Sequence, residues 1–219
     1  MGVDIVSNLD IRNAGRQTRR ALLAGSAASI GLLAVSTSGA RALGVSSAVS
    51  FIQTVAGEVE ALVRSGLGET QLQGRFHDVL GRRAAVAQIA RFCLGSPWRS
   101  LSSTKQRAYV AAFHDNIAIT AVRQFKEVRQ QAQSASLRVT NGIDAGRKGV
   151  LVKSKLSRPG AADIDVDWLV SDRGGSTRVT DIIVEGVSLV ITQREKVSSM
   201  LSRNGNNVDR VISDLARGA

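Results

Sequence analysis

Residues 163–171 read Asp-Ile-Asp-Val-Asp-Trp-Leu-Val-Ser and carry the strongest fold signal in the chain. Ile164, Val166, Trp168 and Val170 stand at alternate positions, and aspartates stand at most of the positions beside them. Successive side chains of a β-strand point to opposite faces, so this period of two predicts a strand with one apolar and one charged face. Such strands are typical of an antiparallel sheet that buries one face only.

Three more stretches with the same period surround this strand, and short turns rich in Gly, Pro and Asp separate them. We therefore expect an antiparallel meander of four strands. The additional strands are predicted at residues 136–143, 150–156 and 177–184. In the first of them, one face is expected to carry Leu137, Val139, Asn141 and Ile143.

The rest of the chain shows the helical period, with apolar residues three and four positions apart. Helices are predicted at 47–65, 69–80 and 83–94, from the cap Ser102-Ser103-Thr104 to about Gln131, at 189–203 and at 208–216. The fold class is therefore α+β, a single domain in which a four-stranded, mainly antiparallel sheet packs against N-terminal and C-terminal helices. From periodicity alone an ordinary packed core is favoured over a ligand cavity. The pattern cannot separate the two, because pockets are built from the same residues.

The first 42 residues have the three parts of an export signal. Arg19 and Arg20 precede a short apolar run at 21–35, and Ala40-Arg41-Ala42 matches a cleavage site. The run is shorter than the roughly 20 apolar residues of a membrane span. We predict a cleaved signal of the twin-arginine type at residues 1–42, a periplasmic location and a mature domain at 43–219.

The chain is basic, with a formal net charge of +11, which by itself favours an acidic partner such as nucleic acid. The predicted signal carries five Arg and two Asp, so 24 basic and 16 acidic residues remain after cleavage. Cellular nucleic acid does not reach the periplasm. We therefore expect contact with anionic lipid surfaces or acidic proteins, no nucleic-acid partner, and a protein that is not integral to the membrane.

Residues that commonly perform catalysis or bind metals are few. One cysteine, Cys93, excludes an internal disulfide, and with two histidines the chain lacks ligands for a Cys/His zinc site. Cys93 falls on the apolar side of a helix and is expected in the core. His77-Asp78 and His114-Asp115 are adjacent residues on helices and therefore do not face each other. No metal, cofactor or catalytic residue is predicted.

Two further polar motifs are better explained by structure than by chemistry. Ser188 lies at a strand-to-helix junction, where a serine commonly caps the helix. Asp163, Asp165 and Asp167 are predicted on the solvent face of their strand, opposite Lys153 and Lys155 of the neighbouring strand. Nothing in these motifs therefore argues for catalysis.

Two blocks resemble the MlaC family, also called toluene-tolerance (Ttg2) auxiliary proteins. The first is Leu-Gly-Ser-Pro-Trp-Arg-Ser-Leu-Ser at 94–102, followed by Gln106 and Phe113. The second combines Val-Asp-Trp-Leu-Val at 166–170 with Val-Thr-Asp-Ile-Ile-Val-Glu-Gly-Val-Ser-Leu at 179–189 and with Gln193-Arg194. The similarity extends from about Val49 to Leu215.

The resemblance implies a periplasmic phospholipid carrier. It would be the substrate-binding component of an ABC-type intermembrane system that maintains outer-membrane lipid asymmetry, with an outer-membrane lipoprotein complex and an inner-membrane MCE-type ABC transporter as its partners. The acyl chains would fill an apolar pocket between the sheet and the helices, while the headgroup stays in solvent. On the strands, the expected tail contacts are Val139, Val150, Val152, Ile164, Val166, Trp168 and Val170, with Phe113 and Ile117 across from them.

Other interpretations stay open from the sequence. A carrier of hopanoid-type lipids would have the same fold. An enzyme of the NTF2-like kind would need a buried acid or base on the inward face, where the expected positions contain none. Asp181, Glu185 and Arg194 match the second block and are expected to form a structural network at the sheet-helix junction.

Overall fold

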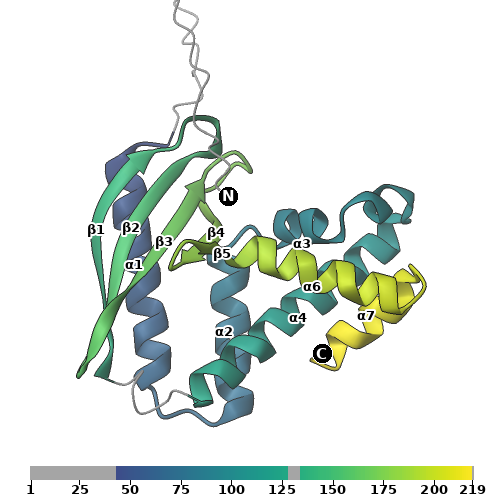
Figure 1. Cartoon of the computed structure of the whole chain (residues 1–219), viewed down its shortest axis with the longest axis horizontal. Helices are drawn as coiled ribbons and strands as arrows, with labels where there is room; N and C mark the ends of the chain where they lie inside the picture. Colours follow the sequence, from purple (N-terminus) through teal and green to yellow (C-terminus); the bar gives the residue numbers. More distant parts are fainter. Residues whose placement is uncertain (1–42, 128–133, 219) are drawn as a thin grey trace, which may run out of the picture. The chain divides into compact units, whose positions relative to one another are not determined.

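An antiparallel sheet with consecutive strands side by side organises the described part of the chain (Figure 1). The computed structural model describes residues 43–127 and 134–218, so the predicted export signal lies outside the described residues. Across the sheet the order is β1 (Ser136–Asp144), β2 (Val150–Arg158), β3 (Ala161–Ser171), β4 (Arg178–Val184) and β5 (Val187–Ser188). The predicted meander is confirmed for the first four of these strands.

Within the described residues the sheet has five strands, so the prediction of four was wrong by one. The extra strand, β5, has two residues and follows a tight turn in which Glu185 and Gly186 have positive φ angles of 49° and 79°. Ser188 pairs with Ile183 of β4. A strand of two residues contains no alternation, so no period could reveal it.

One strand face was also predicted incorrectly. In β1, Val139 pairs with Ser154 while Asn141 pairs with Lys153, so Thr140 is an extra residue in a β-bulge. A bulge reverses the alternation of the strand beyond it. Ile143 consequently lies on the outer face and is 44% exposed, although the pattern placed it with Leu137 and Val139.

Helix α1 (Val45–Arg64) lies across the inner face of the sheet and packs on β1 and β2 (Figure 1). Gly142 permits this approach, because a Cβ atom there would stand 2.7 Å from Val45 Cγ1 and 3.0 Å from Val49 Cγ2. The buried residues of this contact, here named the sheet cluster, are Ala48, Ile52, Val55, Val150, Val152, Val166, Trp168, Val170 and Val179.

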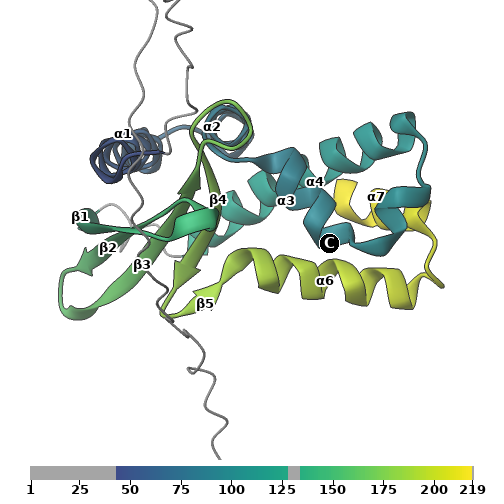
Figure 2. The same ribbon diagram turned by 90° about the horizontal axis from the view of Figure 1, so that it is seen from above.

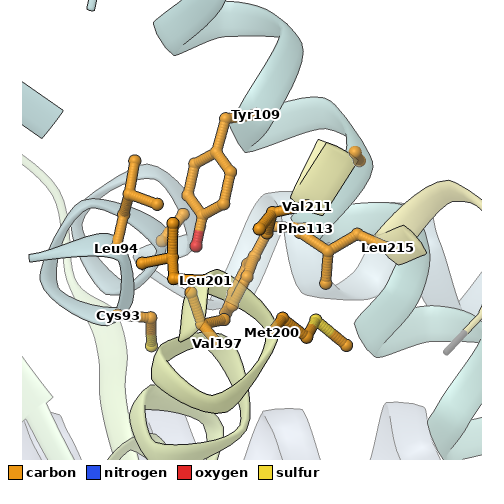
Figure 3. Close-up of a cluster of buried hydrophobic side chains, with 11 residues drawn as sticks. Cys93, Leu94, Tyr109, Phe113, Val197, Met200, Leu201, Val211 and Leu215 are labelled. Carbon is orange, nitrogen blue, oxygen red and sulfur yellow. The ribbon is translucent and has the colours of Figure 1, made fainter. Parts of the chain in front are cut away.

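The remaining helices pack mainly on one another. They are α2 (Glu69–Arg83), α3 (Val86–Leu94), α4 (Ser103–Glu127), α6 (Leu189–Arg203) and α7 (Val208–Ala216), with short 3₁₀ turns η1 (Ser96–Ser100) and η2 (Gly146–Lys148). α6 leaves the sheet at β5 and runs beside α3 (Figure 2). Figure 3 shows Tyr109 and Phe113 of α4 among side chains of α3, α6 and α7. The helix cluster is Ala90, Cys93, Leu94, Tyr109, Ala112, Phe113, Val197, Met200, Leu201, Val211 and Leu215.

Side-chain caps begin the last two helices, α6 and α7. Ser188 caps α6 by accepting a hydrogen bond from the Ile191 amide at 3.1 Å, which confirms the predicted role. The bounds of α6 and α7 agree with the predictions. α3 begins three residues later than predicted, because the Ala85 amide donates a hydrogen bond to the carbonyl oxygen of Val179 in β4 at 2.9 Å. The predicted end of the long helix at Gln131 lies outside the described residues.

Among the described helices, none combines the length and the apolar character that crossing a membrane requires.

Candidate functional site

A first cavity, here named the sheet cavity, lies between the inner face of the sheet and the C-terminal half of α1. Its volume is about 470 Å³. On the sheet side it is lined by Leu137, Leu156, Arg158, Ile164, Val166, Trp168 and Val184. On the other side it is lined by Ala56, Val59, Glu60, Val63 and Arg64 of α1, with Gln124, Ala135 and Leu189 completing the wall. The lining is mostly aliphatic.

A second cavity, here named the helix cavity, lies where α2, α3, α4 and the start of α6 meet β4. Its volume is about 390 Å³. Its apolar lining consists of Phe76, Leu80, Ala84, Val86, Ile89, Phe113, Ile117, Ala121, Val179, Ile182, Leu189 and Val190. Its polar lining consists of Thr120, Gln124, Asp181, Thr192 and Gln193.

The two cavities adjoin, because Gln124 of α4 and Leu189 of α6 line both of them. They border both packed regions: Val166 belongs to the sheet cluster and Phe113 to the helix cluster. Pockets for small ligands typically measure roughly 300–1,000 Å³. The structure therefore leaves apolar space of ligand size where the two clusters do not close on each other.

The predicted site residues fall into three groups. Ile164, Val166 and Trp168 line the sheet cavity, and Phe113 and Ile117 line the helix cavity. The other four pack against α1 in or beside the sheet cluster and line neither cavity: Val139, Val150, Val152 and Val170. The inward face of the sheet thus has a packed part under α1 and an open part beside it.

Several lining residues were missed by the sequence prediction. Val59 and Val63 lie in α1 and Phe76 and Leu80 in α2, all at the helical spacing of apolar residues that an ordinary core also shows. For Leu189 the sequence shows an apolar residue directly after the helix cap Ser188, and the structure shows that its side chain is 41% exposed. A helical stripe shows which side chains leave water but not whether protein atoms fill the space beside them.

Asp181 is the charged residue in the wall of the helix cavity, and its carboxylate is occupied by protein donors. Oδ1 accepts hydrogen bonds from the amides of Ile182 at 2.8 Å and Val190 at 3.1 Å, and Oδ2 accepts one from the Ser188 hydroxyl at 2.6 Å. These bonds fasten β4 to β5 and to the first turn of α6. The carboxylate therefore positions the wall that carries Leu189.

Glu185 and Arg194 also bind protein groups. The Glu185 carboxylate accepts a hydrogen bond from the Asp165 amide, which closes the turn after β4. Arg194 donates to the carbonyl oxygen of Phe92 at 3.0 Å, and its guanidinium lies 4.5 Å from the centre of the Phe92 ring. The prediction of a network at the sheet-helix junction thus holds for Asp181 alone, because Glu185 bonds to β3 within the sheet and Arg194 joins α6 to α3.

The Trp168 side chain lines the sheet cavity without an unpaired polar atom in its ring. Its indole N–H donates to the Ser154 hydroxyl at 3.0 Å, and that hydroxyl donates to the Val166 carbonyl oxygen. Buried indole N–H groups generally find such a partner. The ring therefore adds apolar surface to the cavity while its donor is satisfied within the sheet.

The outer face of the sheet carries the predicted charge pairs. Lys153 Nζ lies 3.1 Å from Asp167 Oδ2, and Lys155 Nζ lies 2.6 Å from Asp165 Oδ1. The hydrogen bond with Lys155 lowers the pKa of Asp165, and the same bond raises the pKa of Lys155. This arrangement confirms a solvated face, and exposed pairs of this kind contribute little to stability.

Cys93 is buried in the helix cluster, as predicted, and burial raises the pKa of its thiol to about 12. A protonated thiol is a poor nucleophile at neutral pH. Within the described ranges, no group of three or more His, Cys, Asp or Glu side chains is arranged to hold a metal ion.

The two histidines stack on each other between α2 and α4, beside the helix cavity. The ring centres of His77 and His114 lie 3.6 Å apart, and His114 Nε2 donates to the His77 carbonyl oxygen at 3.0 Å. Each histidine thus contacts the other helix, and His77 Nε2 lies 3.3 Å from Asp115 Oδ1. Burial, followed by the neighbouring His77, lowers the pKa of His114, while its bond to the His77 carbonyl and the nearby Asp115 and Asp78 oppose this.

We expect stability to decrease in mild acid because of His114. The ordinary pKa of His114 is 6.5 and the folded-state pKa lies below it, so the unfolded chain takes up the proton first as pH falls. Stability is therefore fully present above about pH 6.5 and decreases as pH falls toward the lower folded-state value. Urea unfolding at about pH 7.5 and about pH 5.5 measures the difference, which should be smaller in His114→Gln. An equal difference in both proteins would contradict the assignment to His114.

These features define a class of protein: an α+β domain that keeps adjoining apolar cavities between a sheet and a helical region. The sequence model of the family described as MlaC protein matches residues 53–217. Among solved structures, the chain is similar to the phospholipid-binding protein from Ralstonia solanacearum in complex with a phospholipid. The identity is 17%, the TM-score is 0.62, and the match covers 78% of this chain and 96% of the other. No curated protein matches the chain in sequence. Because the family match spans most of its length, the chain belongs to the MlaC family.

Proposed function

We propose that this protein is a periplasmic phospholipid carrier. It would be exported with a twin-arginine signal at residues 1–42 and work as the mature domain 43–219. As the substrate-binding component of an ABC-type system, it would move phospholipid between an outer-membrane lipoprotein complex and an inner-membrane MCE-type ABC transporter and so maintain outer-membrane lipid asymmetry. It would meet these complexes transiently and catalyse no reaction.

The observation that carries the proposal is the pair of adjoining apolar cavities between the sheet and the helices, of about 470 and 390 Å³. Family membership and the similarity to a fold described with a bound phospholipid support it. Burying two chains of roughly 16 carbons, at about 0.8 kcal/mol per methylene, gains on the order of 20 kcal/mol before entropy and reorganisation costs. Apolar contact alone can therefore hold the tails in water.

The shape of the cavities favours a two-chain lipid over a hopanoid. A fused-ring lipid is one rigid body and needs one continuous space. Here the space consists of two adjoining cavities that share Gln124 and Leu189 as wall residues. Two flexible chains can enter two adjoining cavities separately.

The cavity walls offer little for an enzyme of the NTF2-like kind. Asp181 accepts hydrogen bonds at both carboxylate oxygens. Glu60 accepts one from the Leu137 amide at 2.9 Å and lies 3.5 Å from Arg64. Both carboxylates are therefore engaged by groups of the protein itself.

The direct test is native mass spectrometry of the protein purified from the periplasm, followed by lipid extraction. We expect a mass increase equal to one phospholipid, and recovery of phospholipid in the extract. Protein that arrives empty and takes up nothing from phospholipid vesicles would contradict the proposal.

A variant in the cavity wall should empty the carrier without unfolding it. Val166→Glu places a carboxylate at the sheet cavity, where open space permits hydration but the charge opposes an acyl chain. We expect lipid occupancy to fall about tenfold or more, measured by native mass spectrometry. Ile143→Glu is the matched control, because Ile143 is an exposed strand residue that lines neither cavity. Equal occupancy in folded Val166→Glu would place the tails elsewhere.

A further inference from the structure

The charged groups in the wall of the sheet cavity come from two places in the chain. Glu60 and Arg64 lie in the last two turns of α1, and Arg158 is the last residue of β2. In the helix cavity, by contrast, the charged lining residue is Asp181, whose oxygens bind protein donors. Two guanidinium groups thus accompany one carboxylate at the sheet cavity.

The start of β1 brings Arg64 and Arg158 to the same end of the sheet. Arg64 Nη2 donates to the carbonyl oxygen of Ala135 at 3.2 Å, and Ala135 directly precedes β1. The first residue of β1, Ser136, pairs with Ser157, the neighbour of Arg158 in β2. Arg64 therefore lines the cavity from α1 and Arg158 lines it from β2, and each lies next to the start of β1.

Arg158 has a donor that the protein does not use. Its Nη2 donates to the Ala162 carbonyl oxygen at 3.3 Å, but its Nε is buried and, in the described part of the chain, has no hydrogen-bond partner. Native proteins rarely leave a buried donor unpaired. An anionic oxygen would satisfy it with a charge-assisted bond, which is stronger than a bond to a neutral acceptor.

Glu60 offsets one of these two positive charges and leaves the charge of Arg158 without an ion-pair partner among the described residues. Its Oε1 accepts the Leu137 amide at 2.9 Å, and its Oε2 lies 3.5 Å from Arg64 Nη2. No ion pair within the described ranges involves Arg158. The side chain of Arg64 is 50% exposed, so this end of the cavity meets solvent.

We propose that Arg64 and Arg158 bind the phosphodiester group of the carried lipid, an inference that rests on the proposed function. The tails lie in the apolar cavities, the phosphate meets the two guanidinium groups, and the headgroup alcohol extends into water past Arg64. Guanidinium groups suit this role because their donors match the spacing of phosphate oxygens. The carrier then selects lipids by their phosphate, independently of the headgroup alcohol.

The test compares two lipids with the same acyl chains. Delipidated protein is offered vesicles containing equal amounts of dipalmitoyl phosphatidylglycerol and dipalmitoylglycerol, and the bound lipids are counted by native mass spectrometry. The wild-type protein should take up the phospholipid in preference, by roughly tenfold or more. Phosphatidylethanolamine in place of phosphatidylglycerol should give a similar preference.

The double variant Arg64→Gln/Arg158→Gln should lose roughly tenfold of this preference through weaker phospholipid uptake alone. Unchanged uptake of dipalmitoylglycerol would show that the cavities of the double variant are intact. The control Arg138→Gln/Arg147→Gln removes the same charge at two exposed positions that line neither cavity and should keep the preference. Arg158→Lys keeps the charge but lacks the Nε donor, so an intermediate preference is expected.

Three results would overturn the inference. If the double variant kept the wild-type preference, the proposed phosphate site would be wrong and the carrier proposal would stand. A wild-type protein that takes up neither lipid would defeat both proposals. Calorimetric binding of inorganic phosphate alone that depends on Arg64 and Arg158, combined with no lipid preference, would assign the site to a free anion.

Discussion

Val152→Glu is expected to leave the chain largely unfolded at 25 °C. Val152 has no exposed surface, pairs with Gly142 and Trp168 on its two neighbouring strands, and lies under α1 in the sheet cluster. A glutamate there must bury an unpaired charge or bind a proton, either of which costs several kcal/mol. Domains of this size are stable by only about 5–15 kcal/mol.

Circular dichroism and urea unfolding measure the effect, and Val166→Glu is its natural counterpart. Both positions were predicted as tail contacts, yet only Val166 lines a cavity. We expect the Val166 variant to stay folded with reduced lipid occupancy and the Val152 variant to lose its fold. If Val152→Glu kept the wild-type urea midpoint, the division of the sheet into a packed and an open part would be wrong.

The second large effect is expected for Asp181→Ala. This change removes the acceptor of the Val190 amide and the Ser188 hydroxyl, which together fasten β4 to the first turn of α6. Hydrogen bonds to a charged group each contribute roughly 1.5–3 kcal/mol, so we expect the loss of these two to cost about 3–6 kcal/mol. Leu189 lies in that turn and lines both cavities, so lipid occupancy should also fall.

Urea unfolding measures the stability loss, and hydrogen exchange at the Val190 amide reports the local opening. Asp165→Ala is the control, because its ion pair with Lys155 lies on the solvent-facing side of the sheet and its loss should have little effect on stability. Similar urea midpoints for the two variants would show that Asp181 does not fasten the junction.

Predictions from residue order were accurate wherever one local rule governs an element. Ser188 was identified as the cap of α6, and the strand around Trp168 was placed from its alternation alone. The pairing of Lys155 with Asp165 followed from the same period. These features depend on neighbours in sequence or on the adjacent strand of a meander.

Predictions failed where a distant segment of the chain determines the face of a strand residue or the start of a helix. Ile143 was assigned to the inner face, but the bulge at Thr140 turns it outward. A bulge depends on how two strands match along their length, which no single strand encodes. Likewise α3 begins late because Ala85 bonds to Val179, more than ninety positions away.

Sequence alone determined the class of the fold and the two faces of its sheet, because alternation and helical spacing record which side chains leave water. The family resemblance rested on two blocks of sequence. The sequence could not separate Val152 from Val166, which have the same residue type and the same inward direction. Only the tertiary structure separates them, because α1 crosses the sheet where Gly142 admits it and leaves the remaining inward face uncovered. Whether an apolar side chain packs or lines a cavity depends on what stands opposite it, and that partner comes from a distant part of the chain.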